Sequence, residues 1–376
     1  MQQKLLDFAA RLREPIVNSQ FPTLALELFR LQFEHNVAYR KICKARRLTP
    51  EIVEHWAQIP AVPTTAFKEL DLTCLPPDER TAVFHSSGTT AQKCSQHFHC
   101  VESLAIYEAS LWNWFAVHFQ LPISDCQLVI LAPPPEQAPH SSLVHMFETI
   151  RSRAGESADR SFFGTVAADG SWTLGFDATL AALSPKPGSR DPKPYLLLGT
   201  AFSFVHLLDF MAEKNLRFVL PADSCVMETG GYKNHSRSIP RAELHALIAE
   251  RLGVFPENII CEYGMSELSS QAYTVSGDKC QVTRQAALSC HLSPATCHFR
   301  FPPWARAQIV SPETGREMAD GETGLIRVFD LANVFSVAAI QTEDMGIRHG
   351  DGFELIGRAQ FAEPRGCSLM SDSAFK

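Results

Sequence analysis

The sequence predicts an α/β fold in which a mostly parallel β-sheet carries helices on its faces. Three observations support this prediction. Short apolar runs alternate with amphipathic segments between about residues 81 and 301. These runs have the length and composition of buried strands, and they end in turn residues. The chain also has 376 residues, 45% of them hydrophobic, which is enough to bury a large core in two or more subdomains.

Four apolar runs are the predicted strands of the sheet, and two periodic segments between them are predicted helices. The strands are CQLVILAPPP (126–135), PYLLLGTAF (194–202), LRFVLPAD (216–223) and ENIICEYG (257–264). The helices are SLVHMFETIRSR (142–153) and RAELHALIAERLG (241–253), the second closed by its glycine. In a parallel sheet, ligands bind beyond the carboxyl ends of the strands, so functional residues are expected there.

The segments on either side of this core have different patterns. Residues before about 80 have helical periodicity, including a helix begun by Thr49 and Pro50 in TPEIVEHWAQI. After Pro302 the pattern alternates around glycine turns, which predicts antiparallel strands. The predicted divisions are a helical N-terminal cover (1–80), an α/β core (81–301), a small β-rich subdomain (302–360) and a mobile C-terminal segment (361–376).

The composition argues against several classes of protein. A formal net charge of -7 leaves no basic stripe for nucleic acid. The amino terminus lacks the apolar core of a signal peptide, and polar residues interrupt the most apolar stretch, 195–211. Eleven cysteines occur without CxxC pairs, which favours reduced thiols. Together these observations predict a cytoplasmic protein that does not span a membrane.

Two segments rich in Cys and His are candidates for a metal site. CHLSPATCH (290–298) contains adjacent Cys-His pairs instead of the spaced pairs typical of zinc sites, so zinc is not favoured. KCSQHFHC (93–100) alternates like a strand, so its His and Cys residues are expected to be strand side chains.

Two turn segments could bind an anion or a flat ligand. HSSGTTAQK (85–93) crowds hydroxyl groups around a glycine, which suits an oxyanion, although an ordinary turn has the same composition. It is not a Walker A loop, because GxxxxGK[ST] is absent. METGGYK (227–233) contains paired glycines whose bare backbone would allow a flat ligand to approach, and an ordinary turn is again the alternative. The candidate residues are Ser86, Ser87, Gly88, Thr89, Thr90, Lys93, Gly230 and Gly231.

The turn EYGMSEL (262–268) follows a predicted strand and carries three useful side chains. Tyr263 offers a face for stacking a purine, Ser266 a hydroxyl for a phosphate, and Glu267 an oxygen ligand for Mg²⁺. A solvated turn with a half-buried tyrosine is the alternative.

A predicted hairpin near the end of the chain adds a carboxylate and a guanidinium. In QTEDMGIRHGDGFELIGRAQ (341–360), Asp344 lies near a turn and Arg358 follows the hairpin. A carboxylate can accept hydrogen bonds from both hydroxyls of a ribose, and a guanidinium can donate to them. A surface hairpin with incidental charges is the alternative.

Four of these segments resemble, in the same order, the core motifs of the adenylate-forming superfamily of acyl- and aryl-CoA synthetases, luciferases and peptide-synthetase adenylation domains. SSGTT is similar to the phosphate loop, YGMSE to Tyr-Gly-x-Thr-Glu, TEDMG to Thr-Gly-Asp, and DGFELIGR to the final Gly-Arg element. The resemblance implies that the core binds ATP and Mg²⁺. It assigns ATP to Ser86, Ser87, Gly88, Thr89, Thr90, Lys93, Gly230, Gly231, Tyr263, Gly264, Asp344 and Arg358, and Mg²⁺ to Glu267.

The two ends of the chain resemble one branch of that superfamily. Members usually continue past the Gly-Arg element into a mobile domain with a catalytic lysine, whereas this chain ends soon after Arg358. Together with IPAVPTTAFKEL (59–70) and RGCSL (365–369), this ending resembles the acyl-protein synthetases of the LuxE type. The expected fold is therefore the α/β large domain of adenylate-forming enzymes with a small β-rich subdomain, without the full C-terminal mobile domain.

The resemblance implies a two-step acyl transfer. ATP activates a carboxylic acid, of the long-chain fatty type, as an acyl-adenylate, with Ser266 and Glu267 as catalytic residues. The acyl group then passes to Cys367 as a thioester and onward to a partner reductase, which splits one difficult transfer into two easier ones.

Other interpretations remain open at this stage. His140, Ser141 and Ser142 could line the acid pocket, although a helix start capped by serine explains them equally well. The protein could be an acyl- or aryl-CoA ligase or a carrier-protein loader in which Cys367 is incidental. It could also be a catalytically silent binding subunit.

Overall fold

The computed structural model describes residues 2–12, 18–86, 93–119, 123–155, 161–184, 192–230, 239–275 and 298–359. These residues form two compact units. The first unit comprises the described residues up to Trp114 and from Gly264 onward, and the second comprises those from Phe115 to Tyr263.

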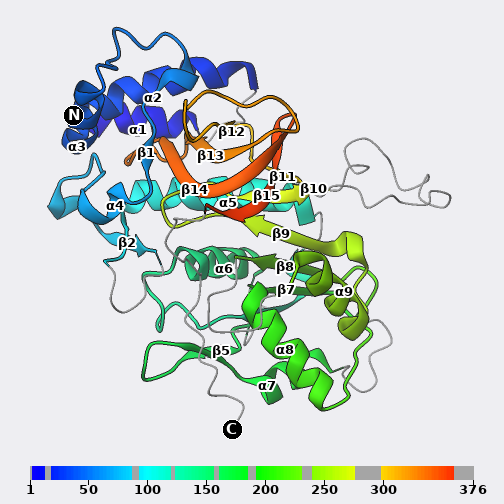
Figure 1. Ribbon diagram of the computed structural model, residues 1–376. Coiled ribbons are helices and arrows are strands. Elements are labelled where there is room, and N and C mark those ends of the chain that lie inside the picture. Colours follow the sequence, from blue (N-terminus) through cyan, green and yellow to red (C-terminus); the bar gives the residue numbers. More distant parts are fainter. Residues whose placement is uncertain are drawn as a thin grey trace. The chain divides into compact units, whose positions relative to one another are not determined.

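A parallel sheet forms the centre of the second unit (Figure 1). Its strands are β4 (Gln127–Leu131), β7 (Tyr195–Thr200), β8 (Cys225–Thr229) and β9 (Ile259–Tyr263). Each is parallel to its neighbour in the order β9-β8-β7-β4. In the same unit, β5 (Gly164–Val166) and β6 (Trp172–Leu174) form a separate antiparallel hairpin. The predicted parallel α/β core is therefore confirmed.

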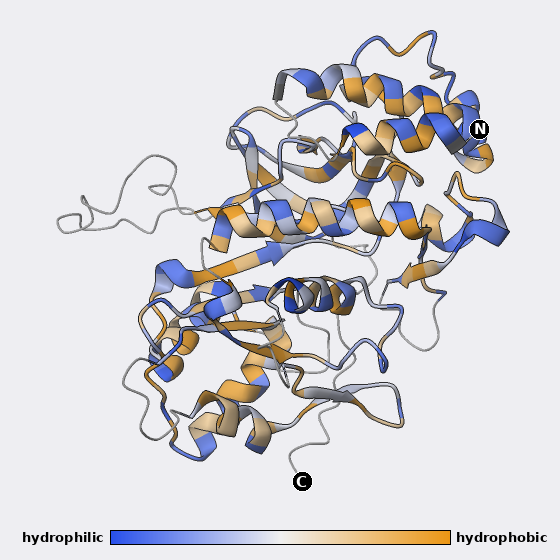
Figure 2. Cartoon of the chain, turned by 180° about the vertical axis from the view of Figure 1, so that it is seen from behind, coloured by the Kyte–Doolittle hydropathy of each residue, from blue (hydrophilic) through white to orange (hydrophobic). Residues whose placement is uncertain are grey.

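The helices of the second unit are α6 (Ser142–Arg153), α7 (Phe176–Leu183), α8 (Ala201–Glu213) and α9 (Arg241–Leu252). Three of them, α7, α8 and α9, share an apolar core with the sheet. Core side chains come from alternate positions of the strands and from α8 and α9. Figure 2 shows apolar residues along most of α8, which is typical of a helix buried on several sides. Gly253 ends α9 with a φ of 69°, as the glycine in the sequence predicts.

One predicted strand of the second unit is wrong. Residues 216–220 in LRFVLPAD are not a strand, and β8 begins only at Cys225. The amide of Phe218 donates to the carbonyl of Arg251 over 2.8 Å, and that of Leu220 to Leu252 over 3.0 Å. Because these amides are bonded to the end of α9, they are not available to a sheet.

The first unit contains an antiparallel sheet. Its strands, in spatial order, are β12 (Ala305–Val310), β13 (Thr323–Asp330), β14 (Ala339–His349), β15 (Gly352–Arg358), β11 (His298–Arg300) and β10 (Ala272–Val275), and β1 (Val62–Pro63) lies parallel to β14. The hairpin of β2 (Ala82–His85) and β3 (Gln96–His99) forms a separate two-stranded sheet. The antiparallel pairing expected after Pro302 is confirmed for β12 to β15.

Helices from the beginning of the chain belong to the same unit. They are α1 (Gln2–Arg11), α2 (Phe21–His35), α3 (Val37–Ala45) and α4 (Ala66–Glu69), and α5 (Val101–Phe119) follows β3. The helix predicted from Thr49 is wrong, because this segment forms a turn and a short 3-10 helix at Trp56–Gln58. The side chain of Gln58 accepts from the amides of Glu54 and His55, and these bonds replace a regular helical start.

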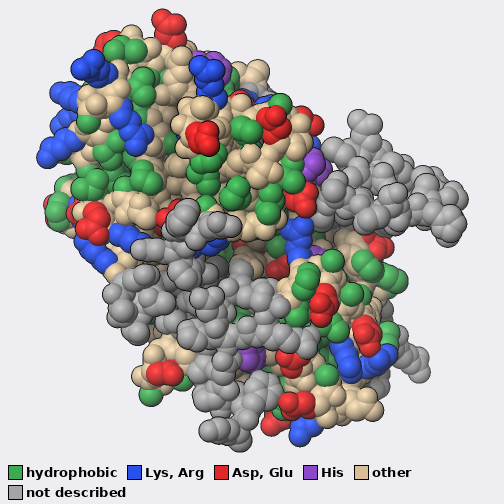
Figure 3. Space-filling model, viewed as in Figure 1, with side chains coloured by type: hydrophobic (Ala, Val, Ile, Leu, Met, Phe, Trp, Pro, Cys, Tyr) green, Lys and Arg blue, Asp and Glu red, His purple; other side chains and the backbone are tan. Residues whose placement is uncertain are grey.

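Figure 3 shows acidic and basic side chains interspersed on the visible face. Among the described residues, no helix has both the length and the apolar character that crossing a membrane requires.

Candidate functional site

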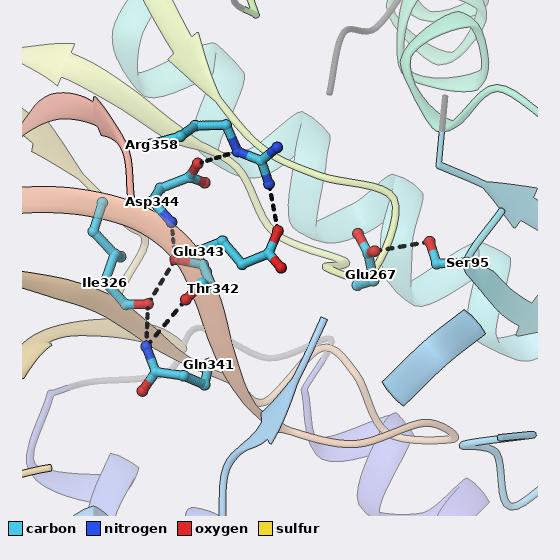
Figure 4. A network of polar contacts seen from close by, with 8 residues as sticks. All are labelled: Ser95, Glu267, Ile326, Gln341, Thr342, Glu343, Asp344 and Arg358. Carbon is cyan, nitrogen blue, oxygen red and sulfur yellow. Dashed lines mark hydrogen bonds and ion pairs between the residues drawn. The ribbon is translucent and has the colours of Figure 1, made fainter. Parts of the chain in front are cut away.

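A buried carboxylate lies at the centre of the turn that follows β9. Glu267 has no exposed surface. The hydroxyl of Ser95 donates to one of its oxygens over 2.8 Å (Figure 4). The hydroxyl of Ser266 donates to the other over 3.0 Å. Ser95 immediately precedes β3, two residues after the end of the segment predicted to bind phosphate. The fold therefore brings a residue next to one predicted motif to the carboxylate of another, within the first unit.

A neutral histidine supports the backbone of this turn. Nδ1 of His97 lies 2.8 Å from the carbonyl oxygen of Ser266. A carbonyl only accepts hydrogen bonds, so Nδ1 must carry the proton. Burial lowers the pKa of His97 to about 4, which leaves the ring neutral at physiological pH. The tautomer with hydrogen on Nδ1 is thereby assigned.

A second support reaches the turn from the loop between β13 and β14. Nδ2 of Asn333 donates to the carbonyl of Glu267 over 2.9 Å. The carboxylate of Asp330 accepts from the amide of Ser269 over 2.9 Å and from the hydroxyl of Ser270 over 2.7 Å. Burial raises the pKa of Asp330 to about 6. These contacts hold the backbone that carries Glu267 in one conformation.

A second polar group in the first unit contains the hairpin residues. Asp344 and Arg358 are directly opposite each other on β14 and β15. Nε of Arg358 donates to Asp344 over 3.3 Å, and Nη2 donates to Glu343 over 2.6 Å (Figure 4). The amide of Asp344 donates to the hydroxyl of Thr342 over 3.1 Å, which orients this part of the strand. The sequence therefore identified a genuine carboxylate–guanidinium pair, but not its second carboxylate.

A β-bulge places Arg358 in this position. The register between β14 and β15 shifts between Met345 and Gly346, so that Ile356 is the extra residue on β15. Gly357 has a φ of 149°, in the region that favours glycine. The glycine of the Gly-Arg element thus has a backbone role, since it allows the bulge that turns the next side chain toward Asp344.

Two of the candidate residues in the predicted phosphate segment, Ser86 and Lys93, are described. The hydroxyl of Ser86 accepts from the amide of Ser95 over 3.0 Å, and this bond joins the residue after β2 to the residue before β3. Lys93 is mostly exposed, and its ammonium lies 3.4 Å from the carboxylate of Glu69. Ser87, Gly88, Thr89 and Thr90, together with Gly231 and Cys367, lie outside the described residues.

The predicted residues of the second unit lie on several elements. Tyr263 is buried at the end of β9, directly before Gly264. Gly230 is exposed after β8, with a φ of 80°. Ser141 is the N-cap of α6 and accepts from the amide of Val144 over 3.2 Å, as one of its two interpretations proposed. His140 is exposed beside it, and Ser142 begins the helix. Their role in an acid pocket remains a prediction.

A family model described as "Acyl-protein synthetase, LuxE" matches residues 4–376. The chain belongs to this family. It is similar to a long-chain-fatty-acid–luciferin-component ligase of Vibrio harveyi, with 26% identity over 356 residues that cover 92% of this chain and 86% of the relative. A protein of the same name from Aliivibrio fischeri is 25% identical over 359 residues, with the same coverage.

Solved structures show the same fold for this acyl-protein synthetase family member. A 2-hydroxyisobutyryl-CoA ligase in an open conformation, with 2-HIB-AMP and CoA, matches with a TM-score of 0.62 and 16% identity. The match covers 94% of this chain and 78% of the ligase. The predicted adenylate-forming fold and the predicted LuxE-type family are both confirmed.

Several residues around the site were not identified from the sequence. Ser95 and His97 belong to a segment whose alternation correctly predicted a strand, but alternation does not show which turn the strand faces. Asn333 carried no signal. Glu343 did carry one, because it stands where the Thr-Gly-Asp pattern of the superfamily has glycine.

A buried pair of side chains at the carboxyl end of the parallel sheet was also missed. Glu262, the residue before Tyr263, is 5% exposed, and the hydroxyl of Thr229 donates to its carboxyl group. Burial, with a smaller contribution from the charge of Glu228, raises the pKa of Glu262 to about 7. Glu228 itself lies 3.1 Å from Nε2 of His245 on α9.

The raised pKa of Glu262 predicts a pH dependence of stability. Between the ordinary carboxyl pKa of 4.5 and about 7, the folded protein holds a proton that the unfolded chain has lost, so the free energy of unfolding falls as pH rises through this window. One pKa unit corresponds to about 1.4 kcal/mol, which gives a loss of roughly 3 kcal/mol. In Glu262→Gln this component of the slope should vanish, as measured by urea denaturation between pH 5 and 8.

Glu250→Gln is the matched control for this experiment. Glu250 lies on the same unit, in α9, and its carboxylate is 45% exposed in a pair with Arg217. This variant should keep the wild-type slope. An unchanged slope in Glu262→Gln would show that Glu262 does not hold the proton.

Proposed function

We propose that this member of the acyl-protein synthetase family activates a carboxylic acid with ATP and loads the acyl group on a protein thiol. The observation that carries the proposal is the Glu267 carboxylate, which is buried and bonded to Ser266 of its own turn and to Ser95, a residue distant in the sequence. A buried carboxylate needs such compensation, and a site that keeps one is expected to use its charge.

ATP, as a substrate, fits the polar group on β14 and β15. Nη1 of Arg358 is buried and has no hydrogen-bond partner among the described residues. A buried donor without a partner costs about 1–3 kcal/mol, so its presence favours a ligand oxygen at this position. The hydroxyls of the ribose are suitable ligand oxygens, because the neighbouring carboxylate of Asp344 can accept from them.

Mg²⁺ fits Glu267 as a single protein ligand. Within the described residues, no group of three or more His, Cys, Asp or Glu side chains could hold a metal ion. Sites for Mg²⁺ commonly use one or two carboxylates and complete the coordination with phosphate oxygens and water. When bound, the ion would neutralise charge on the phosphates of ATP.

The proposed chemistry has two balanced steps. A carboxylate oxygen of the acid attacks the α-phosphorus of ATP, and the bond to pyrophosphate breaks. A cysteine thiolate then attacks the carbonyl carbon of the acyl-adenylate, a C–S bond forms, and AMP leaves with the electron pair of the C–O bond. The hydroxyls of Ser95 and Ser266 keep Glu267 fixed during the first step, which is a positioning role.

We propose Cys367 as the thiol that receives the acyl group. This assignment rests on the resemblance of RGCSL to the acceptor segment of the family. Several of the described cysteines are poor nucleophiles. Burial raises the pKa of the thiols of Cys43 and Cys126 to about 11 and that of Cys74 to about 12, so these thiols are protonated at neutral pH.

The names of the relatives support the choice of acid. Both are long-chain-fatty-acid–luciferin-component ligases, so we propose a long-chain fatty acid as substrate. A reductase as the partner that receives the acyl group is proposed from the resemblance of the sequence motifs alone. A cytoplasmic location belongs to the same proposal.

Acid-dependent exchange of labelled pyrophosphate into ATP tests the activity. A panel of carboxylic acids of different length should include at least one that supports exchange in the presence of Mg²⁺, with fatty acids the most effective. Formation of a thioester on added CoA would favour a CoA ligase instead. Absence of exchange with every acid would favour a silent binding subunit.

A further inference from the structure

The guanidinium of Arg358 is divided between two neighbouring carboxylates. Its Nη2 lies 2.6 Å from Glu343, its Nε lies 3.3 Å from Asp344, and its Nη1 has no partner among the described residues. The side chains are 18–23% exposed, so this is a half-buried cluster and not a surface ion pair.

The division is unusual, because an arginine next to one carboxylate tends to form two parallel hydrogen bonds with it. In such a pair, Nε and Nη2 of Arg358 would both donate to Asp344, one to each carboxylate oxygen. Glu343 prevents this arrangement, since the shorter contact holds the end of the guanidinium. Nη1 takes part in neither arrangement, and it has no partner among the described residues. Glu343 therefore determines the direction in which the guanidinium presents Nη1 to a ligand.

Glu343 also adds an unfavourable negative charge to the proposed site. Two carboxylates face one guanidinium, so the cluster has a net negative charge beside a proposed binding site for an anionic nucleotide. A side chain that only filled space would not need this charge, and the superfamily pattern has glycine at this position. Among the described residues, the contact that offsets this cost is the hydrogen bond with Arg358.

We propose that Glu343 is a positioning residue that orients Arg358 for the ribose of ATP. It acts through Arg358 and does not itself touch the nucleotide. This inference rests on the proposed function, because it takes ATP as the ligand of the cluster.

Glu343→Ala and Glu343→Gln test the inference, with direct binding of ATP and of 2′-deoxy-ATP and 3′-deoxy-ATP measured by calorimetry. Side chains in contact are energetically coupled, so Glu343→Ala should weaken ATP binding on the order of tenfold. The preference of the wild type for ATP over the two deoxynucleotides should fall by a similar factor. Glu343→Gln keeps the length of the side chain and one acceptor oxygen. Its affinity for ATP and its ribose preference should therefore lie between those of the wild type and those of Glu343→Ala.

A double-mutant cycle separates positioning from a general loss of structure. In an Arg358→Lys background, Glu343→Ala should add little further loss, because its effect passes through the guanidinium. Glu317→Gln is the matched control, since Glu317 pairs over 3.1 Å with Arg348 on the same strand. It should change neither the affinity for ATP nor the ribose preference.

The outcomes distinguish this inference from the proposed function. Unchanged ribose preference in Glu343→Ala, or tighter ATP binding, would overturn the inference. Additive losses in the double variant would also overturn it. ATP binding that depends on Glu343 in a protein without acid-dependent pyrophosphate exchange would support the inference and refute the proposed function.

Discussion

Glu267→Gln is expected to lower the rate of acid-dependent pyrophosphate exchange by about 100-fold or more, the effect typical of removing one preorganised electrostatic group from an active site. The substitution keeps the shape of the side chain and one acceptor oxygen for Ser95. It removes the negative charge proposed to hold Mg²⁺, and the new amide nitrogen cannot accept from Ser266.

The dependence on Mg²⁺ makes this prediction specific. The Mg²⁺ concentration that gives half-maximal exchange should rise in Glu267→Gln, whereas Glu267→Asp, which keeps the charge, should retain more activity. Thermal unfolding of each variant controls for damage to the buried turn. Wild-type exchange with wild-type Mg²⁺ dependence in a folded Glu267→Gln protein would remove Glu267 from the mechanism.

Cys367→Ser should abolish the covalent label that the protein acquires from radioactive fatty acid and ATP, while pyrophosphate exchange continues at the wild-type rate. The reason is that the first step needs no thiol, whereas a serine hydroxyl is far less nucleophilic than a thiolate at neutral pH. In the wild type the label should be released by neutral hydroxylamine, as expected for a thioester.

Cys126→Ser is the matched control for the acceptor. Its thiol is half-buried, and burial raises its pKa to about 11, so its loss should leave the label intact. Label retained in Cys367→Ser, or lost in Cys94→Ser instead, would show that another thiol is the acceptor.

The parallel core could be predicted because its strands are continuous apolar runs. Tyr195–Thr200 and Ile259–Tyr263 are buried along their whole length, and a run of this kind is itself the signal for a strand of a parallel sheet. Residues 216–220 are also mostly apolar, but their amides bond to the end of α9 and Val219 is 88% exposed. Apolar composition alone therefore does not decide between a buried strand and a connection.

The candidate site was predictable where a local motif carries it. Asp344 and Arg358 were both named from the hairpin motif, and the hairpin places them opposite each other. Glu267 was identified from its turn, whereas Ser95 and Asn333 reach it from segments distant in the sequence. Long-range contacts of this kind leave no periodicity or spacing in the sequence, so the structure was needed to find them.

The origin of the oxygen atoms in AMP tests the central claim, which is that the acid attacks the α-phosphorus of ATP. The wild-type protein is incubated with Mg²⁺, ATP and a fatty acid whose carboxylate carries ¹⁸O, and the products are analysed by mass spectrometry after acyl transfer. An acyl-adenylate intermediate predicts one labelled oxygen in each AMP and none in pyrophosphate. Unlabelled AMP, or labelled inorganic phosphate formed together with ADP, would contradict this account.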